Sequence, residues 1–178
     1  DYKIVSIVEE AAKYVLREHL KSVGLIATEF TVASGKYAEL IHEGDPECKV
    51  VGKGSPLLAA LVDRGDFNQH DINTEIRTQV DNILAREKVE NLILGCTHFP
   101  ILAPLIQQAV GEGVQLINSA DETAKDVATT LKRRSHLRQD GTGEMRFYTT
   151  GDDIGDFMGL ARRVLRMDDI DVNHIDLP

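Results

Sequence analysis

Short apolar runs alternate with stretches of helical periodicity along almost the whole chain. Runs of consecutive apolar residues bounded by glycine or polar residues predict strands, whereas apolar residues at helical spacing predict amphipathic helices. Strands are expected over residues 3–8, 23–27, 48–51, 92–94, 115–117 and 145–150. Helices are expected over residues 9–20, 31–41, 57–62, 101–110, 120–134 and 154–165, and over a stretch capped by Asp71 or Asn73 that ends near Lys88.

Strands that alternate with helices indicate a parallel sheet, because parallel neighbours are joined by crossovers that usually contain a helix. With right-handed crossovers the expected fold is α/β: a flavodoxin-like, doubly wound parallel sheet with helices on both faces. Residues 92–94 are apolar without interruption, so we expect an inner strand flanked by residues 23–27 and 115–117. A turn is expected at residues 141–143, and the acidic tail from residue 168 onwards is expected to fray.

Composition narrows the class of protein. The 178 residues are 42% hydrophobic and 28% charged, which is ordinary for a globular chain with one good core. The net charge of −9 argues against nucleic acid or an anionic membrane as the main partner. No apolar stretch is long enough to span a membrane, and two cysteines do not make a disulfide framework. A reducing, cytoplasmic location is expected.

The glycines at positions 52 and 54 follow an expected strand and precede a short helix, as in a phosphate-binding loop. The segment lacks the third glycine of a dinucleotide fingerprint and the Gly-Lys-Ser/Thr order of a P-loop. We therefore expect an ordinary strand-to-helix turn over residues 52–56.

One segment, Asn-Leu-Ile-Leu-Gly-Cys-Thr-His-Phe-Pro at residues 91–100, carries the candidate chemistry. Its apolar run stops at Gly95 and places Cys96 and His98 on a turn, before a helix whose first turn tolerates Pro100. Open α/β sheets bind ligands at the carboxyl ends of their strands, and helix N-termini there stabilise thiolates. The segment therefore predicts a reactive thiol in an active site.

Two other interpretations of Cys96 have to be weighed. A cysteine after an apolar run is often a small buried hydrophobic residue, and the residues alone leave this interpretation and the catalytic one open. A metal site is not expected, because Cys96 and His98 supply two ligands and no Cys-x-x-Cys or second Cys/His pair completes four.

Several segments together resemble the glutamate racemases of the aspartate/glutamate racemase superfamily. Gly-Cys-Thr-His-Phe-Pro at residues 95–100 is similar to that family's Gly-Cys-Thr-His-Tyr-Pro signature. The stretch 23–34, with Tyr37 beyond it, resembles a strand-to-helix turn bearing two threonines, and 55–63 resembles a Cys-Pro-Leu…Leu-Val-Glu segment. Residues 7–9, 116–119 and 147–151 match further landmarks in the same order along the chain.

The resemblance implies cofactor-independent chemistry by two cysteines that flank the α-carbon of glutamate. One thiolate removes the α-proton, and the other thiol delivers a proton to the opposite face. Cys96 matches the second of these cysteines, and His98 would assist it by lowering the pKa of the thiol or by shuttling its proton. Asp63 stands where the family has a glutamate that supports the histidine, one methylene longer. Substrate contacts are implied for Thr28, Thr31 and Thr97.

The family's first catalytic cysteine, in a Cys-Asn-Thr motif, has no match in this chain. Cys48 begins an apolar strand and is interpreted as structural. The resemblance therefore implies the C-terminal two-thirds of a racemase. Residues 1–9 would be a crossing strand from the first domain, residues 10–118 the second domain with Cys96, and residues 119–178 a return that completes the first domain. The start at Asp1, without methionine, fits an excised fragment.

The implied function is interconversion of L- and D-glutamate for peptidoglycan biosynthesis, in a cytoplasmic homodimer that needs the missing N-terminal domain. The isolated chain is expected to be inactive. Two alternatives stay open: a non-catalytic domain of the same fold that binds an amino acid or a partner protein, and an aspartate racemase. Aspartate-specific relatives commonly carry glutamate at the position of His98, so the histidine favours glutamate.

Overall fold

The computed structural model describes residues 4–64, 69–141 and 143–177. Its helices are α1 (Ile7–Arg17), α2 (Glu29–Ala33), α3 (Lys36–Gly44), α4 (Leu58–Asp63), α5 (Gln69–Arg86), the 3-10 helix η1 (Phe99–Leu102), α6 (Ala103–Val110), α7 (Ser119–Arg133) and α8 (Ile154–Leu165). Its strands are β1 (Ser22–Thr28), β2 (Lys49–Ser55), β3 (Asn91–Leu94), β4 (Gln115–Asn118), β5 (Phe147–Thr149) and β6 (Val172–His174).

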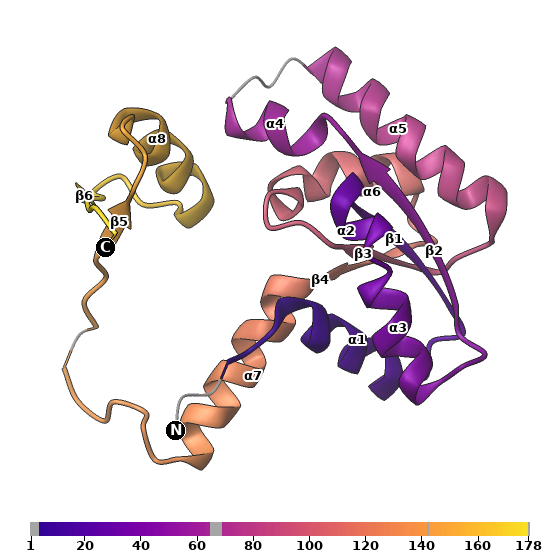
Figure 1. Ribbon diagram of the computed structural model, residues 1–178, viewed down its shortest axis with the longest axis horizontal. Coiled ribbons are helices and arrows are strands. Elements are labelled where there is room, and N and C mark those ends of the chain that lie inside the picture. Colours follow the sequence, from indigo (N-terminus) through magenta and orange to yellow (C-terminus); the bar gives the residue numbers. More distant parts are fainter. Residues whose placement is uncertain (1–3, 65–68, 142, 178) are drawn as a thin grey trace.

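A parallel four-stranded sheet in the order β2-β1-β3-β4 forms the centre of the molecule. The α/β prediction is confirmed, and so is the inner position of β3, which pairs with β1 on one side and β4 on the other. All four residues of β3 are buried, because helices cover both faces of the sheet. The carboxyl ends of the strands point to the left in Figure 1.

Two hydrophobic clusters fill the space on the two faces of this sheet. Successive side chains of a strand point to opposite faces. On β1, Ile26 accordingly belongs to a cluster with α4, α5, η1 and α6, whereas Leu25 and Ala27 belong to a cluster with α1 and α3. The same alternation places Leu92 and Leu94 on one face of β3 and Ile93 on the other. The apolar runs in the sequence therefore supply both layers of the core.

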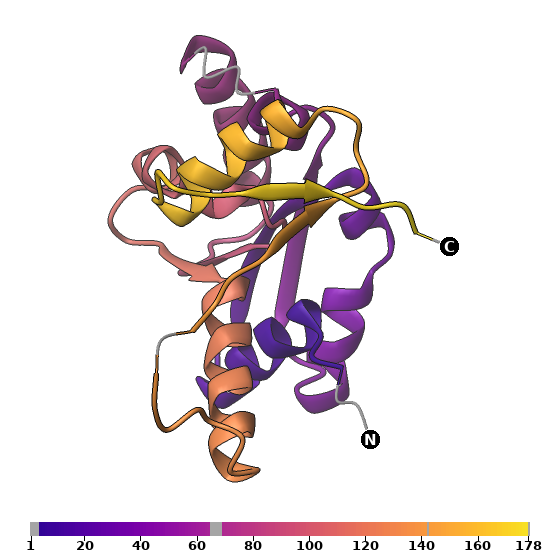
Figure 2. The same cartoon turned by 90° about the vertical axis from the view of Figure 1, so that its left-hand side faces the viewer.

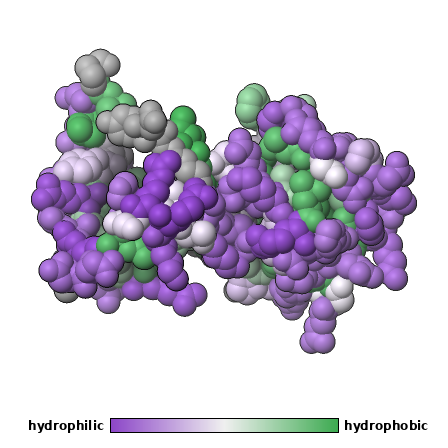
Figure 3. Space-filling model, turned by 90° about the horizontal axis from the view of Figure 1, so that it is seen from below, coloured by the Kyte–Doolittle hydropathy of each residue, from purple (hydrophilic) through white to green (hydrophobic). Residues whose placement is uncertain are grey.

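The C-terminal segment forms a smaller unit beside the sheet. Strands β5 and β6 pair in parallel and α8 connects them, on the side toward which the strands of the main sheet point (Figures 1 and 2). Seen from below, the molecule has two lobes, each covered largely by hydrophilic residues with apolar bands between them (Figure 3). The prediction of a frayed tail is wrong: β6 pairs with β5, and Ile170 and Val172 are only 4% and 6% exposed.

The strand expected over residues 3–8 is not found. Residues 4–6 have no regular structure, Lys3 lies outside the described residues, and α1 begins at Ile7. Ser6 caps this helix, since its Oγ accepts a hydrogen bond of 3.3 Å from the amide of Glu9. Glu9 and Glu10 in the first turn suit the positive end of the helix dipole, so these residues favour a helix over an extended strand.

The glycines at 52 and 54 lie within β2, so the turn expected there is wrong. A Cβ on Gly54 would lie 2.5 Å from Cα of Glu29, and one on Gly52 would lie 3.1 Å from Cγ1 of Val32. The missing side chains let α2 pack directly on the strand. Gly35, with φ of 66°, separates α2 from α3 where one helix was expected over residues 31–41.

Two further helix boundaries differ from the expected ones. Helix α5 already starts at Gln69, so neither Asp71 nor Asn73 is its N-cap. The helix expected over 101–110 starts as the 3-10 turn η1, with Pro100 in its first turn, and continues as α6. The turn expected at 141–143 includes Thr142, which lies outside the described residues.

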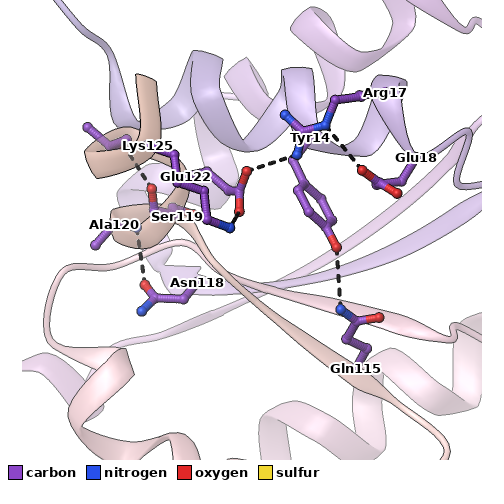
Figure 4. A network of polar contacts seen from close by, with 10 residues as sticks. Tyr14, Arg17, Glu18, Gln115, Asn118, Ser119, Ala120, Glu122 and Lys125 are labelled. Carbon is purple, nitrogen blue, oxygen red and sulfur yellow. Dashed lines mark hydrogen bonds and ion pairs between the residues drawn. The ribbon is translucent and has the colours of Figure 1, made fainter. Parts of the chain in front are cut away.

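Polar contacts join α1 to α7 and to the start of β4 (Figure 4). Glu122 is 7% exposed and accepts hydrogen bonds from Arg17 at 3.0 Å and from Lys125 at 2.6 Å. The guanidinium of Arg17 lies 5.1 Å from the ring centre of Tyr14, whose hydroxyl receives a 3.3 Å hydrogen bond from Gln115. The buried carboxylate thus connects the first helix to the helix that leaves the sheet.

Candidate active site

The turn after β3 presents Cys96 at the carboxyl edge of the sheet. The amide of Gly95 donates to the carbonyl of Ile26 at 2.9 Å, which ties the turn to β1. A Cβ on Gly95 would lie 2.6 Å from Cδ1 of Leu25 and 3.1 Å from Cβ of Ala27. Because residue 95 is glycine, the backbone can lie directly against these core side chains at the position before Cys96.

Cys96, His98 and Asp63 form a continuous chain of side chains. Sγ of Cys96 lies 3.6 Å from Nδ1 of His98, and Nε2 of the same ring lies 2.8 Å from Oδ1 of Asp63. Asp63 is the last residue of α4, 35 positions from His98 in the sequence. The shorter aspartate side chain thus reaches the imidazole, as expected of a residue that supports the histidine.

Burial dominates the electrostatics of the thiol. It raises the pKa of Cys96, the backbone amides of His98 and Phe99 act in the opposite direction, and the negative charge of Asp63 raises the pKa further. The amides thus have the effect expected of a helix N-terminus, but desolvation outweighs it. The net result is a raised pKa of the Cys96 thiol.

Cys48 has a different environment. It is 2% exposed, packs in the cluster beneath α1 and α3, and burial raises its pKa. It immediately precedes β2, so it lies at the amino edge of the sheet, whereas Cys96 follows the carboxyl end of β3. A seven-residue strand spans about 23 Å, so the two thiols are too far apart to act on one carbon atom.

The two threonines of the first strand-to-helix turn face each other. Their Oγ1 atoms are 2.8 Å apart, and Thr28 caps α2 by accepting a 3.2 Å hydrogen bond from the amide of Thr31. The register between β1 and β3 pairs Ile26 with Leu94, so Thr28 and Cys96 both lie two residues beyond the same pair. The threonine pair and the thiol therefore belong to the same edge. Thr97, exposed on the Cys96 turn, lies there too.

Ser55 stands where the resemblance has a cysteine, and it has a structural role. Its side chain is 2% exposed, and its Oγ accepts a 3.0 Å hydrogen bond from the amide of Leu58 in the first turn of α4. The same hydroxyl donates to Oε1 of Glu75 at 2.8 Å, and Gln79 donates to that oxygen at 2.6 Å. These contacts fix the start of the helix that carries Asp63 at its end.

The C-terminal segment reaches this site through α8. A cavity of about 120 Å³ separates it from the end of α4, and Asp63, Arg64, Gly159 and Arg163 contribute to its walls. Leu160 also packs against the core cluster on this face of the sheet. This contact could not be predicted from the sequence, because nothing in the local pattern of residues 154–165 indicates which helix they pack against.

Two polar residues near the thiol were likewise not assigned to the site. Ser119, at the start of α7, is 1% exposed and donates a 3.2 Å hydrogen bond to the carbonyl of Leu94, two residues before Cys96. Tyr37 on α3 is 2% exposed, and burial raises its pKa. The local sequence feature that could have assigned Ser119 to the site is its position directly after an expected strand.

The described part of the chain holds no group of three or more His, Cys, Asp or Glu side chains suited to a metal ion. Across the same residues, none of the helices has the length and hydropathy needed to cross a membrane.

Comparisons with known proteins place the chain in a family. The model of the Asp/Glu/hydantoin racemase family matches residues 3–127, and the chain therefore belongs to that family. A glutamate racemase of Lactiplantibacillus plantarum is 33% identical over 177 residues, which cover 98% of this chain and 64% of the relative. One from a Carnobacterium species is 36% identical over 163 residues, covering 89% of this chain and 60% of the relative.

Solved structures agree with this assignment. A glutamate racemase isoform from Bacillus anthracis superposes with a TM-score of 0.90 at 30% identity, covering all of this chain and 66% of that one. The glutamate racemase of Thermus thermophilus in complex with β-chloro-D-alanine gives a TM-score of 0.82 at 31% identity, covering 99% and 64%. The chain thus spans somewhat less than two-thirds of the length of these relatives.

Proposed function

We propose that this chain is the C-terminal part of a cofactor-independent glutamate racemase, in which Cys96 is one of two thiols that act on the α-carbon. The observation that carries the proposal is the Cys96–His98–Asp63 chain at the carboxyl edge of the sheet. The relatives named above are glutamate racemases, which supports glutamate as the substrate.

The three side chains suit proton transfer at one face of the substrate. Asp63 accepts a hydrogen bond from the N–H at Nε2 of His98, which leaves Nδ1 of the neutral ring as an acceptor toward the thiol. The proton of Cys96 can therefore pass to Nδ1, with the backbone amides of His98 and Phe99 stabilising the resulting thiolate. Because burial raises the pKa of Cys96, the thiol is its resting form and is ready to donate.

Two thiols, one on each face of the substrate, account for every proton and electron in the reaction. A thiolate takes the α-proton of glutamate, and the electrons of the broken C–H bond stay on the α-carbon as a planar carbanion. A thiol on the opposite face then donates its proton to that carbon, so the product is inverted and the two sulfur atoms have exchanged protonation states. Thr28, Thr31 and Thr97 would hold the amino acid by their hydroxyl and amide groups.

The second thiol belongs, in this proposal, to an upstream domain. Cys48 cannot supply it, because it is buried at the opposite edge of the sheet. The proposed division has residues 10–118 as the second racemase domain and residues 119–178 as a return toward the first, in a homodimer that makes D-glutamate for peptidoglycan. A cytoplasmic location suits the proposal, because the reaction requires Cys96 in its reduced form.

Exchange of the α-proton tests the proposal and its alternatives together. The longest protein encoded by the reading frame that contains this chain is incubated in D₂O with L-glutamate or L-aspartate, and loss of the α-proton signal is followed by NMR. We expect rapid loss from glutamate and little from aspartate. Faster exchange of aspartate would favour an aspartate racemase, and binding of glutamate without exchange would favour a non-catalytic domain.

A further inference from the structure

One carboxylate on α5 has no role in the proposed reaction, although it is joined to buried polar groups. Glu75 accepts two hydrogen bonds at the same oxygen, Oε1: one of 2.8 Å from the hydroxyl of Ser55 and one of 2.6 Å from Nε2 of Gln79. Both donor residues are only 2% exposed. Because a buried donor is costly to leave unpaired, these two bonds hold the carboxylate in one orientation.

Gln79 is an unfavourable residue for its position in the core. Its amide oxygen, Oε1, is buried and has no hydrogen-bond partner among the described residues. The neighbouring residues on this face of α5, Ile72, Ile76 and Val80, belong to the hydrophobic cluster, and an apolar side chain at position 79 would avoid the unpaired oxygen. What the amide contributes here is the bond that it donates to Glu75.

The hydroxyl of Ser55 carries a single proton, and Glu75 receives it. The serine oxygen then accepts hydrogen bonds from the amide of Leu57 at 3.2 Å and from the amide of Leu58 at 3.0 Å. A hydroxyl has one donor and two acceptor sites, so these three contacts use all of them. Glu75 therefore fixes the rotation of the hydroxyl and directs its lone pairs toward the start of α4.

The short helix α4 transmits the position of its start to its end. It has six residues and spans about 9 Å, and Leu58, Leu61 and Val62 attach it to the core. Its last residue, Asp63, accepts the 2.8 Å hydrogen bond from Nε2 of His98. An aspartate side chain has only two torsions, so it has little freedom to compensate for a displaced backbone.

We propose that Glu75 is a positioning residue for the proton-transfer chain: through Ser55 it fixes α4, and with it the carboxylate of Asp63 against His98. This inference rests on the proposed role of Cys96 as the acting thiol. It gives the buried polar contacts between β2 and α5 a part in the geometry of the site, through the helix rather than through the substrate.

The test measures the tautomer of the His98 ring by ¹⁵N NMR of the imidazole, in the 178-residue chain and without substrate. At about pH 8.5 an unperturbed imidazole is neutral, and the bond to Asp63 keeps the proton of this ring on Nε2. In Glu75→Ala we expect the ratio of the Nε2–H to the Nδ1–H form to fall by about three- to tenfold, because Asp63 loses its alignment with the ring. The matched control is Asp81→Asn, which removes an exposed carboxylate from the same helix and should leave the ratio unchanged.

Two further variants separate positioning from a purely structural contact. Glu75→Gln should keep the ratio, because one amide oxygen can accept both donors as Oε1 does. Ser55→Ala should lower the ratio as Glu75→Ala does, and the double variant should lower it no further than the larger single change, because both substitutions interrupt one connection.

An unchanged ratio in Glu75→Ala and in Ser55→Ala would overturn the proposal, whether or not the melting temperature falls, since a lower melting temperature alone indicates a purely structural contact. A loss in Glu75→Gln as large as that in Glu75→Ala would also contradict it. Because the tautomer is measured without turnover, an inactive longer protein would contradict the proposed function and leave this result intact.

Discussion

At the scale of single residues, the two thiols differ in solvent exposure, whereas their pKa values shift in the same direction. Burial raises the pKa of both Cys96 and Cys48. Only Cys96 is partly exposed, and only Cys96 receives backbone amides that favour the thiolate. The fold thus desolvates the sulfur of Cys96 and partly offsets the resulting rise in its pKa with oriented backbone dipoles.

Alkylation should separate the two cysteines. We expect iodoacetamide at pH 7 to modify Cys96 before Cys48, slowly at first and faster as the pH rises, because the raised pKa of Cys96 keeps most of it protonated at neutrality. Mass spectrometry of peptides from partly modified protein gives the order of reaction. Preferential modification of Cys48 in the folded chain would contradict the assignment of the reactive thiol.

Neutralising Asp63 should make Cys96 more reactive toward alkylation. The charge of Asp63 raises the pKa of Cys96, so Asp63→Asn should lower that pKa and speed alkylation at pH 7–8 by less than about tenfold, the equivalent of one pKa unit. The matched control is Asp81→Asn, which removes an exposed charge on α5. Slower alkylation in Asp63→Asn would show that the support of His98 by Asp63 outweighs the direct effect of its charge on the pKa of Cys96.

At the scale of elements, apolar patterns predicted strands and helices well where local residues decide the structure. Residues 92–94 were recognised as an inner strand because they are apolar on both sides of the pleat. The patterns failed where a distant contact decides the structure. The glycines at 52 and 54 suggested a turn, but they lie in β2 because α2 packs against them. The tail from residue 168 looked too acidic to fold, but β6 pairs with β5.

The turn that carries Cys96 should be intolerant of a side chain at Gly95. Gly95→Ala would place a Cβ 2.6 Å from Leu25 and 3.1 Å from Ala27, so we expect a loss of about 1–3 kcal/mol in the free energy of unfolding. The displaced turn should also change the alkylation rate of Cys96. Gly113→Ala is the control, because nothing lies within 4 Å of its new Cβ. Equal stabilities of the two variants in urea would refute this account of the turn.

The contact between α1 and α7 should depend on pH through Glu122. Burial alone would raise the pKa of Glu122, but hydrogen bonds from Lys125 and Arg17 outweigh it, and the pKa is lowered. A lowered carboxyl pKa stabilises the fold above the ordinary value near 4.5, and this stabilisation is lost as the pH falls below it.

Glu122→Gln should therefore lower the free energy of unfolding by about 1–2 kcal/mol at pH 7, and by less at pH 3. The expected loss is no larger because the side chains of Arg17 and Lys125 are largely exposed to solvent. Urea denaturation at the two pH values measures the difference. The control Glu39→Gln breaks an exposed pair with Lys36 and should have no measurable effect. A penalty for Glu122→Gln that does not decrease at low pH would contradict the role given to its charge.

At the scale of the whole molecule, the candidate site could be predicted only in part. Cys96 and His98 are close in sequence, so one turn was enough to place them together. The link to Asp63 came from a resemblance, since nothing local relates residues 35 positions apart. Ser119 meets the end of β3 only because β3 and β4 are neighbours in the sheet. No periodic pattern in the sequence indicates this contact.

The arrangement of the two thiols limits what the isolated chain can do. With Cys48 at the far edge of the sheet, only one face of a bound glutamate would meet a thiol. A single base returns the proton mainly to the face from which it came, and losing one well-placed acid or base typically costs 10²–10⁴-fold or more. We therefore expect negligible inversion by the 178 residues alone.

Circular dichroism of the amino acid shows whether Cys96 is one of two acting thiols in a glutamate racemase. Saturating L-glutamate is incubated with the longest protein encoded by the reading frame, with its Cys96→Ala and Cys48→Ala variants, and with the isolated chain. We predict that the signal decays toward zero with the unaltered protein and with Cys48→Ala, and stays constant with Cys96→Ala and with the isolated chain. Decay at an undiminished rate in the Cys96→Ala variant would show that Cys96 is not one of the acting thiols.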